Sequence, residues 1–459
     1  MKLVYDVKDK PKFGQLIVFA IQQLLAIMAA TLVVPVIINS NIGLEGAEAM
    51  SPAAALFGAG IGTLIYILCT KAKSPVFLGS SFAFIGSMTA AFSGAVAVGY
   101  LGLVIGAIFA GLVYVIIAIV VKFVGVKWVS KLMPAVVIGP TVAIIGLSLA
   151  GNAVGDFTKS NYEGGSTYIA IICALITIGV TMLCSTYGKR NIKLIPFIMG
   201  ILAGYVAATI FYFIGKATGN AAFMIIDYSA LTSNFQDITV SSFVSVPSFT
   251  FLTAFKGFGE ITGADIATVA VAYIPVAFVV FAEHIADHKN LSSVIEKDLL
   301  EDPGLDKTLL GDGIGSMVGA FFGGCPNTTY GESVGCVAIT RNASVYTIIT
   351  AAVGAMLISF ITPFVAFVNT IPSCVMGGVC MALYGFIAVS GLKMIKEVDL
   401  DENRNLFVVS VIFIAGIGGL SISFGKVTLT SIACALILGI LTNAMLSKKT
   451  ADEIKESAE

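Results

Sequence analysis

The chain has 459 residues, of which 57% are hydrophobic and only 12% are charged, and its formal net charge at pH 7 is -1. Soluble domains carry roughly 25% charged residues, so this composition excludes a soluble globular protein. The near-zero net charge and the lack of a broad basic stripe in the sequence also exclude a nucleic-acid-binding surface. Apolar runs long enough to cross about 30 Å of hydrocarbon recur from end to end, which indicates an all-α polytopic membrane protein.

The first apolar run, "LIVFAIQQLLAIMAATLVVPVII", is too long for the core of a signal peptide and lacks a small-residue cleavage site, so we expect a retained span. Eight cysteines fall in or beside apolar segments, which predicts no disulfide framework, and no motif indicates a cofactor. We count fourteen candidate spans. They cover residues 14–38, 52–70, 80–92, 98–121, 131–150, 167–184, 194–215, 268–287, 309–323, 331–341, 345–370, 373–392, 405–424 and 428–446.

The distribution of basic residues between these spans predicts the orientation of the chain. Lys and Arg concentrate on the cytoplasmic side of membrane proteins. With the N-terminus inside, 22 of the 26 basic residues fall in cytoplasmic segments, and the exceptions are Lys159, Lys216, Lys256 and Lys426. One span more or fewer would scramble this split, so we expect fourteen spans in the cell membrane with both termini in the cytoplasm.

An internal repeat relates the two halves of the chain. The segment "LMPAVVIGPTVAIIGLSLAG" (132–151) resembles "TIPSCVMGGVCMALYGFIAVSG" (370–391), and "FIMGILAGY" (197–205) resembles "LILGILTNA" (436–444). The third and tenth spans, which are too short to cross a membrane alone, occupy matching places in each set of seven. Because seven is odd, the second copy must be inverted, which is the architecture of secondary transporters, and paired short spans mark their substrate site.

Ionisable side chains within a span are costly and therefore indicate function. The stretch "VFAEHIADHKN" places Glu283 and Asp287 on one helix face, and His284 and His288, the only histidines in the chain, on a second face. Glu283 lies deepest and is expected in a substrate pocket. Asp287 and His288 are interpreted either as a proton relay below that pocket or as the solvated end of the helix. His284 is interpreted as a packing or hydrogen-bonding residue.

A second acid opens the tenth span. Glu332 lies in the glycine-rich stretch "GGCPNTTYGESVGCVAITR", where a half-helix would present free backbone N-H groups. The matching stretch "SPVFLGSSFAFIGSM" presents Ser81 and Phe82 at the third span. Two carboxylates that accept hydrogen bonds, two half-helix ends that donate them, and the rings of Phe82 and Tyr330 suit a planar, neutral, amide-like ligand such as uracil or xanthine.

At these residues the sequence resembles the nucleobase/ascorbate transporter family, and within it the bacterial uracil permeases. The resemblance covers nearly the whole chain and rests on the combination of "LLAIMAATLVVPVI", "FLGSSFAFI", "AEHIADH", "LLGDGIGSMVGAFFGG" and "NTTYGESVGCVAITR". It implies two inverted repeats of seven spans, proton symport and a homodimer. It also implies a core domain (14–121 and 268–370), a gate domain (131–215 and 373–446) and an extracellular loop (216–267).

The resemblance also implies roles for single residues. Glu283 matches the glutamate that hydrogen-bonds the pyrimidine, and Glu332 matches the acid of the span-ten signature. Gly331 and Phe82 match positions whose backbone N-H groups meet the base carbonyls, and Tyr330 lies beside them in the pocket. An acid at position 332 is the uracil-type choice, since purine members tend to carry glutamine and ascorbate members proline.

Three positions depart from the family pattern. Span one reads Gln22, Gln23 where Gln-His is common, and Ser333 replaces the usual asparagine of the signature. Four residues after Glu283, where uracil permeases place a histidine, this chain has Asp287. Proton coupling through that histidine therefore cannot be carried over.

The hypothesis that follows is a transporter, not an enzyme, which imports uracil with a proton by alternating access. Burial penalises the charged form of a carboxylate, so Glu283 is expected to take up a proton from outside, and Asp287 or His288 to pass it inward. Alternatives are a xanthine or purine permease, coupling to sodium instead of protons, and a channel or anion transporter of related fold. A metal-dependent enzyme using His284 and His288 as ligands is a further alternative, although no third ligand stands out.

Overall fold

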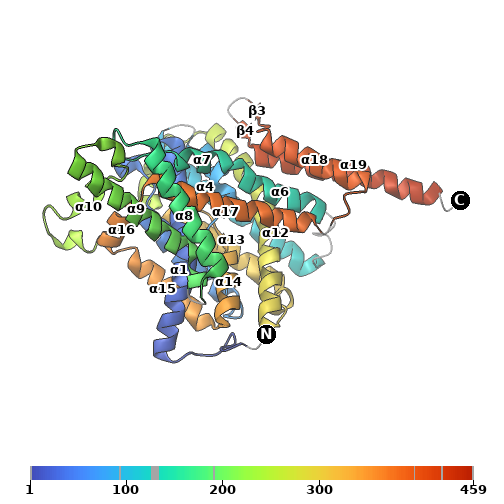
Figure 1. Ribbon diagram of the computed structural model, residues 1–459. Helices are drawn as coiled ribbons and strands as arrows, with labels where there is room; N and C mark the ends of the chain where they lie inside the picture. The colour runs from blue at the N-terminus through green and yellow to red at the C-terminus, as the bar shows by residue number, and fades with distance from the viewer. Residues whose placement is uncertain are drawn as a thin grey trace.

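We describe the protein from a computed structural model, which describes residues 3–92, 95–125, 134–189, 192–396, 398–424 and 427–456. Five of the 26 basic residues lie outside these ranges: Lys2, Lys127, Lys131, Arg190 and Lys426. The first three residues of the predicted span 131–150 also lie outside them. The described chain is built mainly of helices (Figure 1).

The helices of the first half begin after the short polar N-terminus and end before the long loop. They are α1 (Phe13–Ile42), α2 (Pro52–Cys69), α3 (Ile85–Ala91), α4 (Val96–Val124), α6 (Ala135–Ser148), α7 (Ala150–Phe157), α8 (Thr167–Tyr187) and α9 (Pro196–Thr218). The loop and second half contain α10 (Ser229–Asn234), α11 (Thr250–Ala254), α12 (Gly263–Ile295), α13 (Leu305–Gly323), α14 (Gly331–Thr340), α15 (Val345–Ile358), α16 (Thr362–Asn369), α17 (Ser373–Ile395), α18 (Asn403–Ile417) and α19 (Ser431–Glu456).

Two pairs of short antiparallel strands interrupt the helices. Strand β1 (Leu78–Ser80) pairs with β2 (Asn327–Thr329), and β3 (Ile422–Phe424) pairs with β4 (Val427–Leu429). Short 3-10 turns lie at Gly46–Glu48, Phe82–Phe84, Ile192–Leu194, Ala221–Phe223, Val240–Ser242 and Phe255–Gly259, and a π-helical turn lies at Leu300–Gly304.

Eight helical segments within the described ranges are long and apolar enough to cross a membrane. They are Phe13–Ile42, Gly46–Cys69, Val96–Val124, Ala135–Phe157, Thr167–Tyr187, Pro196–Thr218, Gly263–Ile295 and Ser373–Ile395. Shorter apolar helices lie at Phe82–Ala91, Val345–Ile358, Asn403–Ile417 and Ser431–Leu446. The protein is therefore a helical, multi-pass membrane protein.

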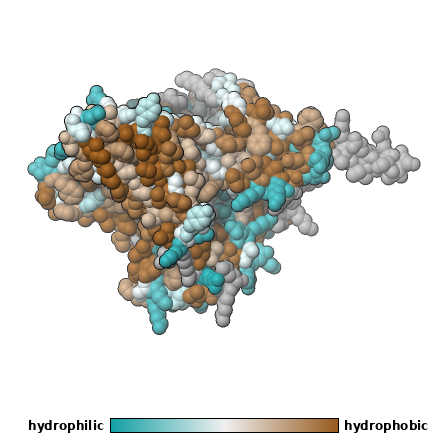
Figure 2. All heavy atoms as spheres, in the orientation of Figure 1, coloured by the Kyte–Doolittle hydropathy of each residue, from teal (hydrophilic) through white to brown (hydrophobic). Residues whose placement is uncertain are grey.

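Large apolar side chains face outward on the helices that would meet lipid. On α8 and α9 these include Leu175, Leu183, Val206, Ile210 and Phe213, each more than half exposed. Brown spheres accordingly cover the upper left of the molecule, where α8 and α9 lie (Figure 2). An apolar surface of this extent is expected of a protein whose solvent is hydrocarbon.

The structure differs from the predicted spans at several places. The predicted spans 405–424 and 428–446 each include residues of a strand, because β3 covers Ile422–Phe424 and β4 covers Val427–Leu429. The predicted span 345–370 is two helices, because α15 ends at Ile358 and α16 begins at Thr362. The predicted span 268–287 is too short, because α12 continues to Ile295 and ends only at Glu296, whose φ is 56°. Its polar residues do not end the helix, since they find partners inside the protein, as described below.

Glycines allow α2, α4 and α13 to pack closely. A Cβ on Gly62 would lie 2.7 Å from the carbonyl oxygen of Gly315, and a Cβ on Gly313 would lie 2.9 Å from that of Gly111. Small residues at helix interfaces let backbones approach inside a membrane, where the hydrophobic effect does not drive association. These contacts form a rigid backing for the two short strands and the half-helices that follow them.

Candidate substrate site

Two half-helices begin side by side at the centre of the fold. Strands β1 and β2 cross in antiparallel register, with Leu78 opposite Thr329 and Ser80 opposite Asn327. A 3-10 turn starts at Phe82 directly after β1, and α14 starts at Gly331 directly after β2. Neither start has a side-chain cap, so first-turn N-H groups of both are available to a ligand.

A cavity of about 360 Å³ lies in front of these two helix starts. Three carboxylates face it, from Glu283 and Asp287 on α12 and from Glu332 on α14. The remaining lining residues are mainly apolar or neutral. They are Phe82, Ala83, Val142, Ile145, Phe197, Ala286, Thr328, Thr329, Tyr330, Gly331, Leu383, Phe386, Ile387, Ser390 and Met394.

Five of the six residues that the sequence predicts for the substrate site line this one cavity. They are Glu283, Glu332, Phe82, Gly331 and Tyr330. The sixth, Ser81, is buried behind the wall, and its N-H donates to the carbonyl of Pro326 at 2.9 Å. Ser81 therefore fixes the start of the first half-helix and is not among the residues that line the cavity.

Tyr330 is held by the strand pair. Its hydroxyl donates to the carbonyl oxygen of Ser80 at 2.7 Å, and its side chain is only 4% exposed. A hydrogen bond from one strand region to the other fixes the ring at the edge of the cavity. The ring is thus a rigid wall for a flat ligand.

The structure separates the two residues that the sequence grouped as a relay. Asp287 lines the cavity, and the Thr329 hydroxyl donates to its Oδ2 at 2.8 Å. His288 faces away from the cavity and is fully buried: its Nε2 lies 2.6 Å from the Tyr66 hydroxyl and its Nδ1 lies 2.7 Å from the His284 carbonyl oxygen. The reading of His288 as a solvated helix end is therefore wrong.

His284 is a hydrogen-bonding residue, as its position predicted. Its Nδ1 lies 2.7 Å from Asp312 Oδ2 and its Nε2 lies 3.0 Å from the Thr308 hydroxyl, with all three residues fully buried. All four ring nitrogens of His284 and His288 thus have protein partners. This pairing argues against the alternative in which the two histidines bind a catalytic metal.

Asp312 was missed by the sequence reasoning. It lies on α13, in the quoted stretch "LLGDGIGSMVGAFFGG", as an acid within a glycine-rich apolar helix. The cost of an ionisable group inside a span was the signal that could have found it. It supports α12 from behind, on the side of the helix away from the cavity.

A second buried link joins two positions that depart from the family pattern. The Gln23 amide donates to the Ser333 hydroxyl, and the backbone N-H of Phe77 donates to the same oxygen at 3.1 Å. Gln23, Ser333 and Phe77 are each at most 2% exposed. Helix α1, the approach to β1, and the first turn of α14 are therefore tied together at one serine oxygen.

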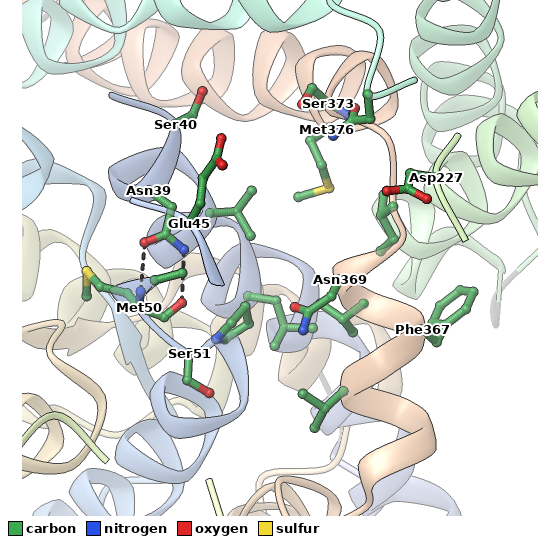
Figure 3. A pocket seen from close by; sticks show the side chains of 18 of the residues that line it. Asn39, Ser40, Glu45, Met50, Ser51, Asp227, Phe367, Asn369, Ser373 and Met376 are labelled. Atoms are coloured by element: carbon green, nitrogen blue, oxygen red, sulfur yellow. Dashed lines mark hydrogen bonds between the residues drawn. The ribbon is translucent and has the colours of Figure 1, made fainter. Parts of the chain in front are cut away.

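A larger cavity, of about 890 Å³, lies near the C-terminal end of α1 (Figure 3). Its wall includes Glu45, Asp227 and Asn369, and the Asn39 amide is bonded to the backbone of Met50 at 2.8 and 2.9 Å. It includes neither half-helix start and none of the buried acids. We therefore place the candidate site in the smaller cavity, where these groups converge.

Comparison with known proteins identifies the family of the chain. Residues 14–424 match the model of a family described as the permease family. The chain is 37% identical to a uracil permease from Bacillus caldolyticus, over 97% of this chain and 95% of that one. It is 35% identical to a uracil permease from Bacillus subtilis, over 99% of this chain and 98% of that one.

Among solved structures, the murine anion transporter Slc26a9 in its inward-facing state superposes with a TM-score of 0.62 at 10% identity, covering 96% of this chain and 69% of that one. A likeness at this identity concerns the fold alone. The family match and the two relatives, by contrast, extend over almost the entire sequence. The chain belongs to the permease family whose motifs it carries, the nucleobase/ascorbate transporters.

Proposed function

We propose that the protein imports uracil across the cell membrane by proton symport with alternating access. One observation carries the proposal: Glu283, Glu332 and the starts of both half-helices border the same cavity. Uracil has two ring N-H donors and two carbonyl acceptors on one flat ring. The two carboxylates are suited to its donors, and backbone N-H groups near Phe82 and Gly331 are suited to its carbonyls.

The walls of the cavity favour a flat ring of this size. Phe82 and Tyr330 offer aromatic faces, and base stacking on an aromatic side chain contributes about 1–3 kcal/mol. A volume of about 360 Å³ lies at the small end of ligand pockets. A xanthine or other purine permease is the alternative, and it would need the same donors and acceptors in a wider space.

The packing supports the predicted division into a moving core and a gate. Helix α13 packs on α2 and α4, and α12 packs on α4. Elsewhere α6 packs on α17, α8 on α9, and α18 on α19. We assign the first group, with the half-helices, to the core (14–121 and 268–370) and the second to the gate (131–215 and 373–446). Fourteen spans in two inverted repeats, with both termini cytoplasmic, complete the proposed topology.

The cavity faces the side that the basic residues mark as cytoplasmic. Phe386, Ser390 and Met394 follow the last three turns of α17 toward Lys393 and Lys396. Phe386 and Ser390 are both exposed along this stretch of α17. We propose that this end of the cavity opens toward the cytoplasm, as in an inward-open conformation.

Radiolabelled uracil uptake into proteoliposomes tests the proposal. We expect uptake that is driven by an inward proton gradient and is unaffected by replacing sodium with choline. Glu332→Gln should weaken uracil binding by tenfold or more, since a charge-assisted hydrogen bond contributes about 1.5–3 kcal/mol. A matched control is Glu301→Gln, an acid outside the cavity.

Two results would contradict the proposal. If Glu332→Gln binds uracil with wild-type affinity, the assignment of the binding site to this cavity is wrong. If uptake follows a sodium gradient, sodium and not the proton is the coupling ion. A binding screen with uracil, thymine, xanthine, guanine and uric acid identifies the base. Mass measurement of the purified protein in detergent tests the homodimer that the family resemblance implies.

A further inference from the structure

The cavity contains more acid than its proposed substrate can use. Glu283, Asp287 and Glu332 all line it, and no Lys, Arg or His is among the described lining residues. Uracil is neutral and brings no positive charge. Three ionised carboxylates in a cavity of about 360 Å³ would repel one another strongly.

The three acids are not equivalent. Glu332 is in the first turn of α14, where the helix N-terminus stabilises a negative charge. Glu283 and Asp287 are four residues apart in the middle of α12, far from either of its ends, so they lack this support and repel each other when both are charged. Glu332 is therefore the acid that can remain ionised.

Asp287 is held in place facing the cavity. The Thr329 hydroxyl donates a hydrogen bond to Asp287 Oδ2 at 2.8 Å. The other carboxylate oxygen, Asp287 Oδ1, would lie 3.8 Å from a Cβ placed on Gly331. The free oxygen therefore points toward the start of α14. Between Glu283 and Asp287 on the helix, Ala286 is exposed, so both acids can exchange protons with the open side of the cavity.

The groups packed behind α12 supply no positive charge to these acids. On the far side of the helix, both ring nitrogens of each histidine are engaged by protein partners. The titratable groups that face the pair from neighbouring elements are acids or phenols. They are Glu332 of α14, Asp312 of α13, Tyr114 of α4, Tyr66 of α2 and Tyr330 at the end of β2.

We infer that two protons, one on Glu283 and one on Asp287, accompany each uracil molecule. The inference rests on the proposed function and deepens it by giving the coupling stoichiometry. Each proton comes from water on the outer side, neutralises one carboxylate of α12 while the core moves, and is released to water on the inner side. Glu332 remains ionised and accepts a hydrogen bond from the base.

A null-point experiment in proteoliposomes measures this ratio. With the membrane potential held at zero, net uracil flux stops when the uracil gradient balances the proton gradient. For two protons, one pH unit balances an about hundredfold uracil gradient, whereas for one proton it balances an about tenfold gradient. The null point is an equilibrium quantity, so it does not depend on how fast a variant works.

We expect the wild type to stop at the two-proton ratio and Asp287→Asn to stop at the one-proton ratio. Asparagine keeps an oxygen for the Thr329 hydroxyl but cannot titrate. Asp302→Asn is the matched control, because Asp302 is exposed and paired with Lys73 outside the cavity, and it should keep the two-proton ratio.

The outcomes separate this inference from the proposed function. A wild-type one-proton ratio, or the same ratio in wild type and Asp287→Asn, overturns the stoichiometry while uracil symport stands. Wild-type protein that carries no uracil overturns the proposed function, and this inference with it. If Asp287→Asn does not fold, the proton-to-uracil ratio of the wild type alone decides whether the stoichiometry is two.

Discussion

Ser333 is the position where one missing oxygen should cost most. Ser333→Ala removes the acceptor for the Gln23 amide and for the backbone N-H of Phe77. These residues are at most 2% exposed, so water cannot replace the lost oxygen. Each buried donor left unsatisfied costs about 1–3 kcal/mol. The free energy of unfolding should therefore fall by about 2–6 kcal/mol, or by the lower part of that range if the Gln23 amide turns to another acceptor.

Thermal unfolding of the purified protein in detergent measures this effect. The control is Ser410→Ala, which makes the same chemical change on an exposed helix face, where the hydroxyl donates only to the Leu406 carbonyl. We expect a clearly lower midpoint for Ser333→Ala and an almost unchanged one for Ser410→Ala. Uracil affinity should fall with it, because Ser333 fixes the first turn of α14. Equal midpoints for the two variants would refute the reasoning.

Three further predictions use other parts of the structure. Gly62→Ala should lower thermal stability, because its Cβ would lie 2.7 Å from the Gly315 carbonyl oxygen, whereas Gly179→Ala on α8 has nothing within 4 Å and should be neutral or stabilising in the same assay. Phe82→Ala should weaken uracil binding, measured by calorimetry, by about 1–3 kcal/mol if its ring stacks on the base; unchanged affinity would exclude stacking. The hydrogen bond from Lys297 lowers the pKa of Asp6, so the pair stabilises the protein above the ordinary Asp range and loses that effect as the pH falls through the lowered pKa. Both partners are nearly half exposed, so Asp6→Asn should cost less than about 1 kcal/mol at pH 7 and nothing near pH 2.

The sequence was sufficient to predict the parts of the site that follow from local rules. An ionisable side chain inside an apolar span is costly and therefore indicates a functional site, which identified Glu283 and Glu332. Two spans too short to cross a membrane, at matching places in a repeat, indicated that their starts, near Phe82 and Gly331, would form one substrate site. The strands β1 and β2 that join these starts were not predicted. The first signal lies within the span that contains the acid, and the second comes from comparing the two halves of the sequence, so no knowledge of the packing was required.

The supporting contacts could not be predicted in the same way, because their partners lie far apart in the chain. Gln23 and Ser333 are 310 positions apart, and each alone reads as an unremarkable polar residue. The predicted end of α12 was wrong for a related reason. Polar side chains at positions 287 and 288 predict a helix end only when no buried partner exists, and their partners, Thr329 and Tyr66, come from other elements.

The two sides of the cavity differ in a way that bears on transport. The hydrogen-bonding groups belong to α12, β2 and the two half-helices, whereas the opposite wall from α6, α9 and α17 is apolar except for Ser390. Hydrogen bonds are directional and costly to leave unmade, whereas apolar contacts tolerate sliding. A ligand held by the first wall could therefore move with it past the second without breaking a hydrogen bond. In the proposed alternating-access cycle, the buried hydrogen bonds at His284 and Ser333 would keep the first wall rigid while it carries the substrate.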